Sequence, residues 1–171
     1  FNLISPTFFA NSSTGNKYSL WVNVYGVSER YLNVYGEKDL RAQMNQFFHR
    51  TYTHPVDGTT LDMKMLCNWY WYDETAILET GKGTKDWNFY RYAETLLSAA
   101  EAIAQSSGVN AEAAGYLAQV KARANMEGKD VSTIASELQR LGKQAFIEEC
   151  WKERLREFPL EMKIWDDCVR T

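Results

Sequence analysis

Apolar side chains recur at the spacing of an amphipathic helix throughout the second half of the chain. The first stripe consists of Phe89, Ala93, Leu96, Leu97, Ala100, Ile103 and Ala104. Spacing of this kind places the apolar side chains on one face of a helix. Ser106 and Ser107 precede Gly108, which suits the left-handed backbone that commonly ends a helix. The pattern therefore predicts a helix that ends at Gly108.

A second helix is predicted directly after the first. Asn110 is a suitable N-cap, and the apolar stripe after it consists of Ala113, Leu117, Val120 and Ala124. Gly115 and the alanines make this helix thin, so a neighbouring helix should approach it closely. Because the connection is short, the two helices should form an antiparallel hairpin.

More helical segments are expected beyond residue 130. Ser132 can cap a third helix, with Gly142 loosening its end, and its apolar positions are Ile134, Leu138 and Leu141. The next stripe consists of Ile147, Trp151, Leu155 and Phe158. Pro159 should stop or kink this helix, because proline lacks an amide hydrogen and its ring clashes with the preceding turn. A last short helix is predicted from about Leu160 to Arg170, with Trp151 and Trp165 buried.

The first half of the chain is rich in aromatic residues and glycines and predicts short strands and turns. Of the 24 aromatic residues of the chain, 19 lie between Phe1 and Tyr92. Alternation predicts one strand over 20–25, and a second strand over 66–72 in which Trp69 and Trp71 would share one face. A helical turn is predicted over 37–44. The predicted fold is mainly α, with a loop-rich aromatic region at 1–86 and a helical region at 87–171.

The composition excludes several classes of protein. The 171 residues are 45% hydrophobic and carry a formal net charge of −3, which suits one cored domain and not a basic nucleic-acid binder. No stretch approaches the roughly 18 apolar residues that span a bilayer. The first twelve residues lack the features of a signal peptide, so we expect the chain to be processed or cut from a larger protein.

The cysteines and histidines do not form a recognisable site. The three cysteines are odd in number and widely spaced, which argues against a disulfide framework, and Cys150 and Cys168 are expected to be small buried hydrophobes. His49 and His54 match no metal-ligand spacing and are expected on the surface or in loops. No cofactor is predicted.

Four sequence motifs follow one another along the chain. They are Tyr35 with Asp39-Leu-Arg41, the segment RYAETLLSAAEA at 91–102, the segment VKARA at 120–124, and ERLREFPLEMKIWDDCVR at 153–170. In order and spacing they resemble the motifs of the SusD/RagB family. Some positions depart from the family pattern: Met162 stands where the family has glycine, Ile164 replaces an arginine, Pro159 lies inside the last motif, and Lys121 replaces an arginine. The turn before the last helix should therefore be built differently here.

The resemblance implies a fold, a location and partners. Members of the family are outer-membrane lipoproteins that bind oligosaccharides at the cell surface for nutrient uptake. They cap a TonB-dependent, SusC-like transporter, and their scaffold is an α–α superhelix of tetratricopeptide-like helix pairs. The chain is similar to the C-terminal part of such a protein, so membrane attachment would come only through an N-terminal lipid anchor outside it. The resemblance implies no enzymatic activity.

The sequence motifs contain five acids that could be either catalytic or structural: Glu94, Glu101, Glu153, Glu157 and Asp167. Glycoside hydrolysis needs two carboxylates about 5–10 Å apart. These acids, however, lie on predicted helices with arginines close in sequence, which is typical of helix ion pairs. We therefore expect a structural ion-pair network.

The aromatic residues of the first half are the candidates for a ligand site. Flat Trp and Tyr rings pack against the apolar faces of sugars, and the candidates are Trp21, Tyr25, Trp69 and Trp71. Alternatively, these rings fill a region that lacks regular core elements. Two other functions stay open: a helix-repeat interaction module without a ligand, and a glycan-active hydrolase, which would need close carboxylates of raised pKa.

Overall fold

The structure is a computed structural model that describes residues 27–56, 58–76, 79, 83–86, 88–159 and 161–170. The chain divides into two compact units. One contains Arg41–Trp87 with the residues before Val34, and the other contains Val34–Leu40 and Asn88–Thr171. The predicted strand over 20–25, with Trp21 and Tyr25, lies outside the described residues.

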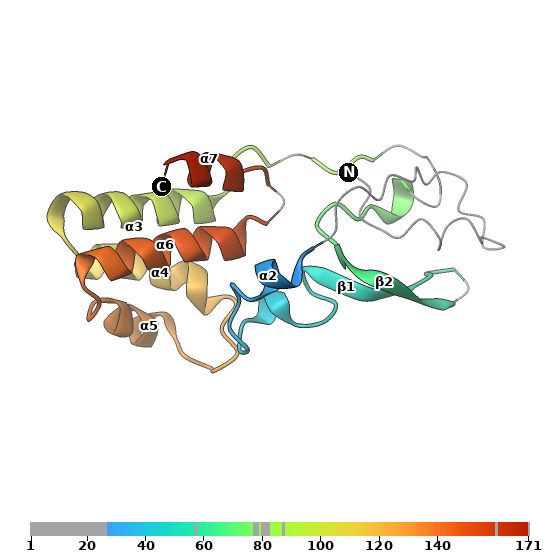
Figure 1. Cartoon of the computed structure of the whole chain (residues 1–171), viewed down its shortest axis with the longest axis horizontal. Coiled ribbons are helices and arrows are strands. Elements are labelled where there is room, and N and C mark those ends of the chain that lie inside the picture. Colours follow the sequence, from blue (N-terminus) through green and yellow to red (C-terminus); the bar gives the residue numbers. More distant parts are fainter. Residues whose placement is uncertain are drawn as a thin grey trace. The chain divides into compact units, whose positions relative to one another are not determined.

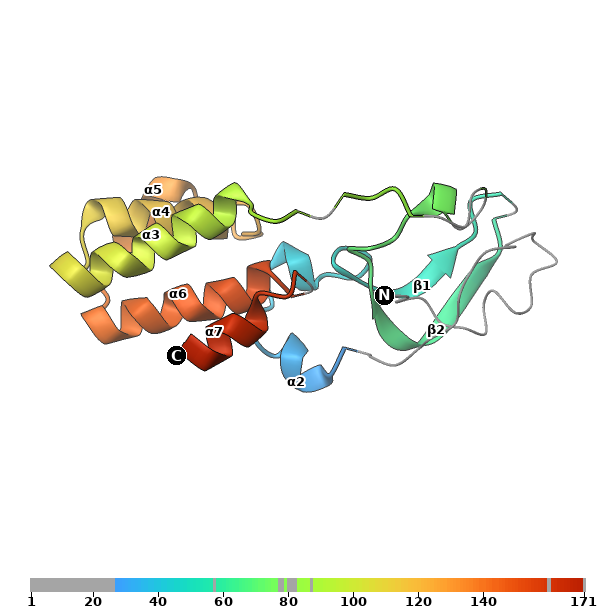
Figure 2. The ribbon, with the colours of Figure 1, turned by 90° about the horizontal axis from the view of Figure 1, so that it is seen from above.

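The second unit is helical, as the apolar pattern predicted. Its helices are α3 (Tyr92–Ser107), α4 (Ala111–Ala122), α5 (Val131–Leu138), α6 (Lys143–Glu157) and α7 (Ile164–Arg170). Helix α3 packs against α4 and α6, α4 packs against α5, and α6 contacts α7. Figures 1 and 2 show α3, α4 and α6 side by side. Leu97, Leu117, Phe146 and Cys150 are fully buried in one core that α3, α4, α5 and α6 share. Burial raises the pKa of Cys150 to about 12, so this cysteine is an inert core residue.

Local signals set several of the helix ends. Gly108 follows α3 with φ of 82°, and the Asn110 side chain accepts a hydrogen bond of 2.9 Å from the amide of Ala113. Both predictions are confirmed. Helix α6 ends at Glu157, and Phe158 is its C-cap, directly before Pro159.

Other local predictions are wrong. The N-cap of α5 is Asp130, which accepts from the amide of Thr133, so Ser132 lies inside the helix. Gly142 does not loosen a continuous helix, because it is the N-cap of the separate helix α6. A Cβ on Gly115 would meet nothing within 4 Å, so the close approach expected on α4 does not occur at this glycine, whereas the alanines Ala113, Ala114 and Ala118 are fully buried. The last helix starts at Ile164 and not near Leu160.

The segment Val34–Leu40 belongs to the helical unit through long-range hydrogen bonds. The Tyr35 hydroxyl donates to the carbonyl of Arg156 at 3.0 Å, and the Arg156 Nε donates to the carbonyl of Val34 at 2.7 Å. The amide of Leu40 donates to the carbonyl of Ala124. The family-like tyrosine upstream of the helices is therefore a structural tie to α6.

The other unit contains an antiparallel hairpin of β1 (Phe48–Thr53) and β2 (Thr60–Asn68). The register shifts between His49 and Thr51, where the pairing is irregular. The unit also contains α2 (Glu29–Leu32), which Ser28 caps. The helical turn expected over 37–44 is a 3-10 turn over Leu40–Ala42.

Candidate functional site

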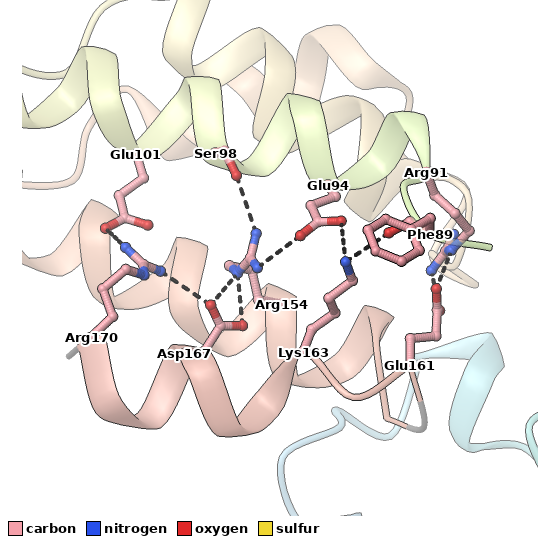
Figure 3. A network of polar contacts seen from close by, with 10 residues as sticks. All are labelled: Phe89, Arg91, Glu94, Ser98, Glu101, Arg154, Glu161, Lys163, Asp167 and Arg170. Carbon is pink, nitrogen blue, oxygen red and sulfur yellow. Dashed lines mark hydrogen bonds and ion pairs between the residues drawn. The ribbon is translucent and has the colours of Figure 1, made fainter. Parts of the chain in front are cut away.

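The acids and arginines of the sequence motifs pair with one another across the helical unit (Figure 3). Arg154 of α6 donates from Nε to both oxygens of Asp167 of α7 at 2.8 Å. Glu94 of α3 lies 3.6 Å from Arg154 and 3.1 Å from Lys163. Arg170 binds Glu101 of α3 at 2.6 Å and Asp167 at 3.3 Å. These contacts join α7 to α3 and α6.

A second group of pairs surrounds the end of α6. Arg91 donates to Glu157 at 2.9 Å and to both oxygens of Glu161 at 2.6 and 2.7 Å. Arg123 also binds Glu157, and the guanidinium of Arg91 lies over the ring of Phe158. The first, second and last helical motifs therefore meet at Glu157.

The electrostatics of these carboxylates are those of ion pairs. Burial alone would raise the pKa of Glu157, but hydrogen bonds from Arg91 and Arg123 outweigh it and hold the pKa below its ordinary value. The same balance of burial against Arg170 lowers the pKa of Glu101. A general acid of a glycosidase needs the opposite shift, and the predicted ion-pair network is present.

Aromatic rings gather on the hairpin and on the turn that follows it. The predicted strand over 66–72 is confirmed only for residues 66–68, because β2 ends at Asn68. The Asn68 side chain accepts from the amide of Tyr70 at 2.7 Å, and the amide of Tyr72 donates to the carbonyl of Trp69. Such side-chain-to-backbone bonds compete with strand pairing. Trp69 and Trp71 therefore lie in a turn and do not share a strand face.

Trp69 is the middle ring of a stack. The His49 ring lies 4.0 Å from it with an interplanar angle of 10°, and the Tyr72 ring lies 4.6 Å from it at 18°. Suppose instead that the His49 and Tyr72 rings lay on the same face of Trp69, each at a stacking distance of about 3.5 Å. The centroids of these two rings would then be at most about 5 Å apart, which is too close for two rings side by side. His49 and Tyr72 therefore cover opposite faces of Trp69.

Two further groups fix this stack in place. The Tyr52 hydroxyl lies 3.0 Å from the Tyr72 hydroxyl, which donates to Glu74 at 3.3 Å. Tyr52 is buried, and so is His54, whose Nδ1 accepts from the amide of Val56. His54 lies in the loop between β1 and β2, as expected, although its side chain is buried, and His49 lies within β1. Burial lowers the pKa of His49, although bonds to the backbone of Gln46 and Thr51 oppose this.

Trp71 lies in the turn that follows β2 and is partly exposed. Its ring meets the Tyr70 ring edge to face at 4.8 Å. Lys85 binds the Tyr70 carbonyl and lies over the Tyr70 ring. Asp73 accepts from the amides of Ala76 and Thr84, which closes the following loop.

The structure brings two of the four predicted ligand residues, Trp69 and Trp71, into one turn, and neither is fully buried. Sequence reasoning missed His49, Tyr52 and Tyr72. The run of four aromatic residues directly after Asn68 was the available signal, since asparagine favours turns. Within the described part of the chain, no group of three or more His, Cys, Asp or Glu residues could hold a metal ion.

Three predictions about buried side chains in the helical unit are wrong. Trp165 on α7 is 76% exposed, and Cys168 is exposed too. Phe89 precedes α3 and is exposed, so it does not belong to the apolar stripe of that helix. Trp151 does pack against the core. No described helix is long and apolar enough to cross a membrane.

Comparisons with known proteins agree with the motifs. The sequence profile described as SusD family matches residues 11–171. A crystal structure of a SusD superfamily protein from Parabacteroides distasonis ATCC 8503 matches with a TM-score of 0.76 and 26% sequence identity. The match covers 96% of this chain and 35% of that one, so the chain spans about a third of the length of this relative. No curated protein matches the sequence.

Proposed function

The chain belongs to the SusD family, and on that premise we propose that it binds oligosaccharides at the cell surface for nutrient uptake. Family membership implies in general a glycan-binding role at the outer membrane, and SusD proteins are generally non-catalytic. Because the chain spans 35% of the solved relative, the activity of the whole protein is part of the proposal. The proposal also includes the delivery of the bound glycan by the whole protein to a SusC-like, TonB-dependent transporter.

The aromatic turn after β2 supports the proposal most directly. Trp69, Tyr70, Trp71 and Tyr72 follow one another there, and each is partly exposed. Aromatic rings of this kind supply large, rigid and amphipathic contact area. A stack held by hydroxyl contacts to Tyr52 and Glu74 is preorganised, which reduces the cost of ordering on binding.

Isothermal titration calorimetry of the 171-residue chain with soluble oligosaccharides tests the proposal. Linear gluco-, xylo- and manno-hexaoses are suitable probes. We expect dissociation constants of about micromolar to millimolar, with little dependence on salt because few ion pairs would form. Trp71→Ala should weaken binding by about tenfold. Trp165→Ala is the matched control, because it removes an exposed tryptophan from the other unit and should change nothing.

The helix-repeat interaction module is the second candidate, and the exposed face of α7 favours it. Trp165 and Val169 lie one helical turn apart and are both exposed, and exposed tryptophans are enriched at protein interfaces. Calorimetry discriminates between the two candidates. If the parent chain bound no oligosaccharide of a broad panel, the glycan-binding proposal would be refuted and this candidate would take its place.

A further inference from the structure

The stack of His49, Trp69 and Tyr72 limits which ring can touch a sugar. A sugar packs on an open aromatic face, but both faces of Trp69 are covered, at 4.0 Å by His49 and at 4.6 Å by Tyr72. Among the described residues, these two rings leave the edge of Trp69 and the parts of its faces that they do not overlap. A new ring can therefore join this stack only at one of its two ends, beyond His49 or beyond Tyr72.

Tyr52 does not occupy either end. Its ring centroid lies 5.5 Å from Trp69 and 5.8 Å from Tyr72. A ring stacked beyond Tyr72 would lie about 8 Å from Trp69, since each layer adds about 3.5 Å. Tyr52 therefore lies beside the stack and fixes it laterally. Among the described residues, the ring contacts of Tyr72 are those with Trp69 and Tyr52.

The two ends of the stack differ in the polar groups beside them. Glu74, which is exposed, lies within 3.3 Å of the Tyr72 hydroxyl, so the Tyr72 end combines an aromatic face with a carboxylate. A carboxylate accepts strong hydrogen bonds from the hydroxyls at the edge of a sugar ring. Its negative charge disfavours a uronic acid or a sulfated sugar in the same place. The His49 end offers a smaller, more polar ring.

We infer that a neutral sugar ring packs on the outer face of Tyr72, with Glu74 accepting from one of its hydroxyls and Trp69 acting as a positioning residue. The inference rests on the proposed function and names its contact residues and ligand class. Trp69 acts through Tyr72: it supplies the surface that holds the tyrosine ring in a fixed orientation. Tyr52 holds the hydroxyl end of the same ring.

The experiment compares four variants of the 171-residue chain by calorimetry with the neutral hexaoses. Tyr72→Ala should lose at least about tenfold in affinity, in line with aromatic stacking energies. Glu74→Gln keeps the shape of the side chain and should lose about threefold to tenfold. Trp69→Phe keeps an aromatic ring in the stack and should lose less than Tyr72→Ala. Trp165→Ala should match the parent.

Near-ultraviolet circular dichroism reports whether the stack is intact in each variant. A folded Tyr72→Ala that kept the parent affinity would overturn the inference, while the proposed function would stand on another ring such as Trp71. If Tyr72→Ala does not fold, nuclear Overhauser contacts between sugar C–H protons and the Tyr72 ring decide the question in the parent chain: their presence supports the inference, and contacts confined to other rings overturn it. If the parent bound none of the hexaoses, the proposed function would fail, and the inference with it.

Discussion

Replacing Met162 with glycine should make the protein more stable. Met162 has φ of 57°, in the left-handed region that costs a non-glycine residue about 1–2 kcal/mol. Its side chain is 56% exposed, so its removal costs little packing. Glycine also gives the unfolded chain more conformational freedom, which lowers the free energy of unfolding by about 0.4–1 kcal/mol. The two effects together should raise the free energy of unfolding by about 0.5–1 kcal/mol.

The reason that Met162 tolerates this backbone lies in its two neighbours. Glu161 binds Arg91 at 2.6 Å, and Lys163 binds Glu94 at 3.1 Å and the carbonyl of Phe89 at 2.8 Å. The left-handed residue between them turns the chain into α7 while both side chains keep their partners on or beside α3. The family pattern has glycine at this position, which needs no strain.

Thermal unfolding followed by circular dichroism measures the effect. A gain of about 0.5–1 kcal/mol corresponds to a rise in Tm of about 1–4 °C for a chain of this size. Met126→Gly is the matched control, because Met126 is 49% exposed and has no positive φ. That variant should lower Tm, since glycine only adds freedom to the unfolded chain. If both variants lowered Tm, the reasoning about strain at residue 162 would be refuted.

Three further predictions concern the helical unit. Leu96→Ala should lower the free energy of unfolding by about 2–5 kcal/mol in urea titrations, because Leu96 is part of the buried core and its truncation leaves a cavity; an unchanged midpoint would mean that the side chain does not pack there. Asp167→Asn should lower the free energy of unfolding by about 3 kcal/mol, the lower end for unpairing a buried charge, because Glu94 still lies near Arg154. Glu153→Gln should also destabilise the fold, because Glu153 pairs with Arg156. The pKa of Glu157 is lower in the folded state, so its stabilising contribution is present above the unfolded pKa near 4.5 and is lost as the pH falls through the folded value. Urea titrations from pH 7 to pH 3 should show this loss in the parent and less of it in Glu157→Gln.

The parts of the fold that the sequence predicts are those that depend on neighbouring residues. Gly108 and Asn110 lie next to each other and decide a helix end and a helix start through their own backbone and side chain. Asp130 and Ser132 are both suitable N-caps, and only the structure shows that Asp130 is the one used, because its side chain accepts from the amide of Thr133. Sequence patterns do not contain that information.

The candidate site depends on contacts that a local pattern does not contain. The abundance of aromatic residues indicated the region, but the stack needs His49 of β1 beside Trp69, twenty positions later in the chain. That pairing follows from the register of the hairpin, in which His49 faces Cys67. It also needs β2 to end at Asn68 so that the turn can fold back. The stack therefore could not be derived from alternation alone.

The error at Trp165 follows from an assumption about amphipathic helices. An apolar stripe normally faces the core, but α7 is inverted: Asp167 is buried against Arg154, while Trp165 and Val169 are exposed. The inner face of this short helix has to be polar, because it meets the charged side chains that α3 and α6 direct toward it (Figure 3). The residues that identify the family are therefore the residues that position α7. A chain with the same apolar pattern but without these charges would have no reason to bury this face of α7.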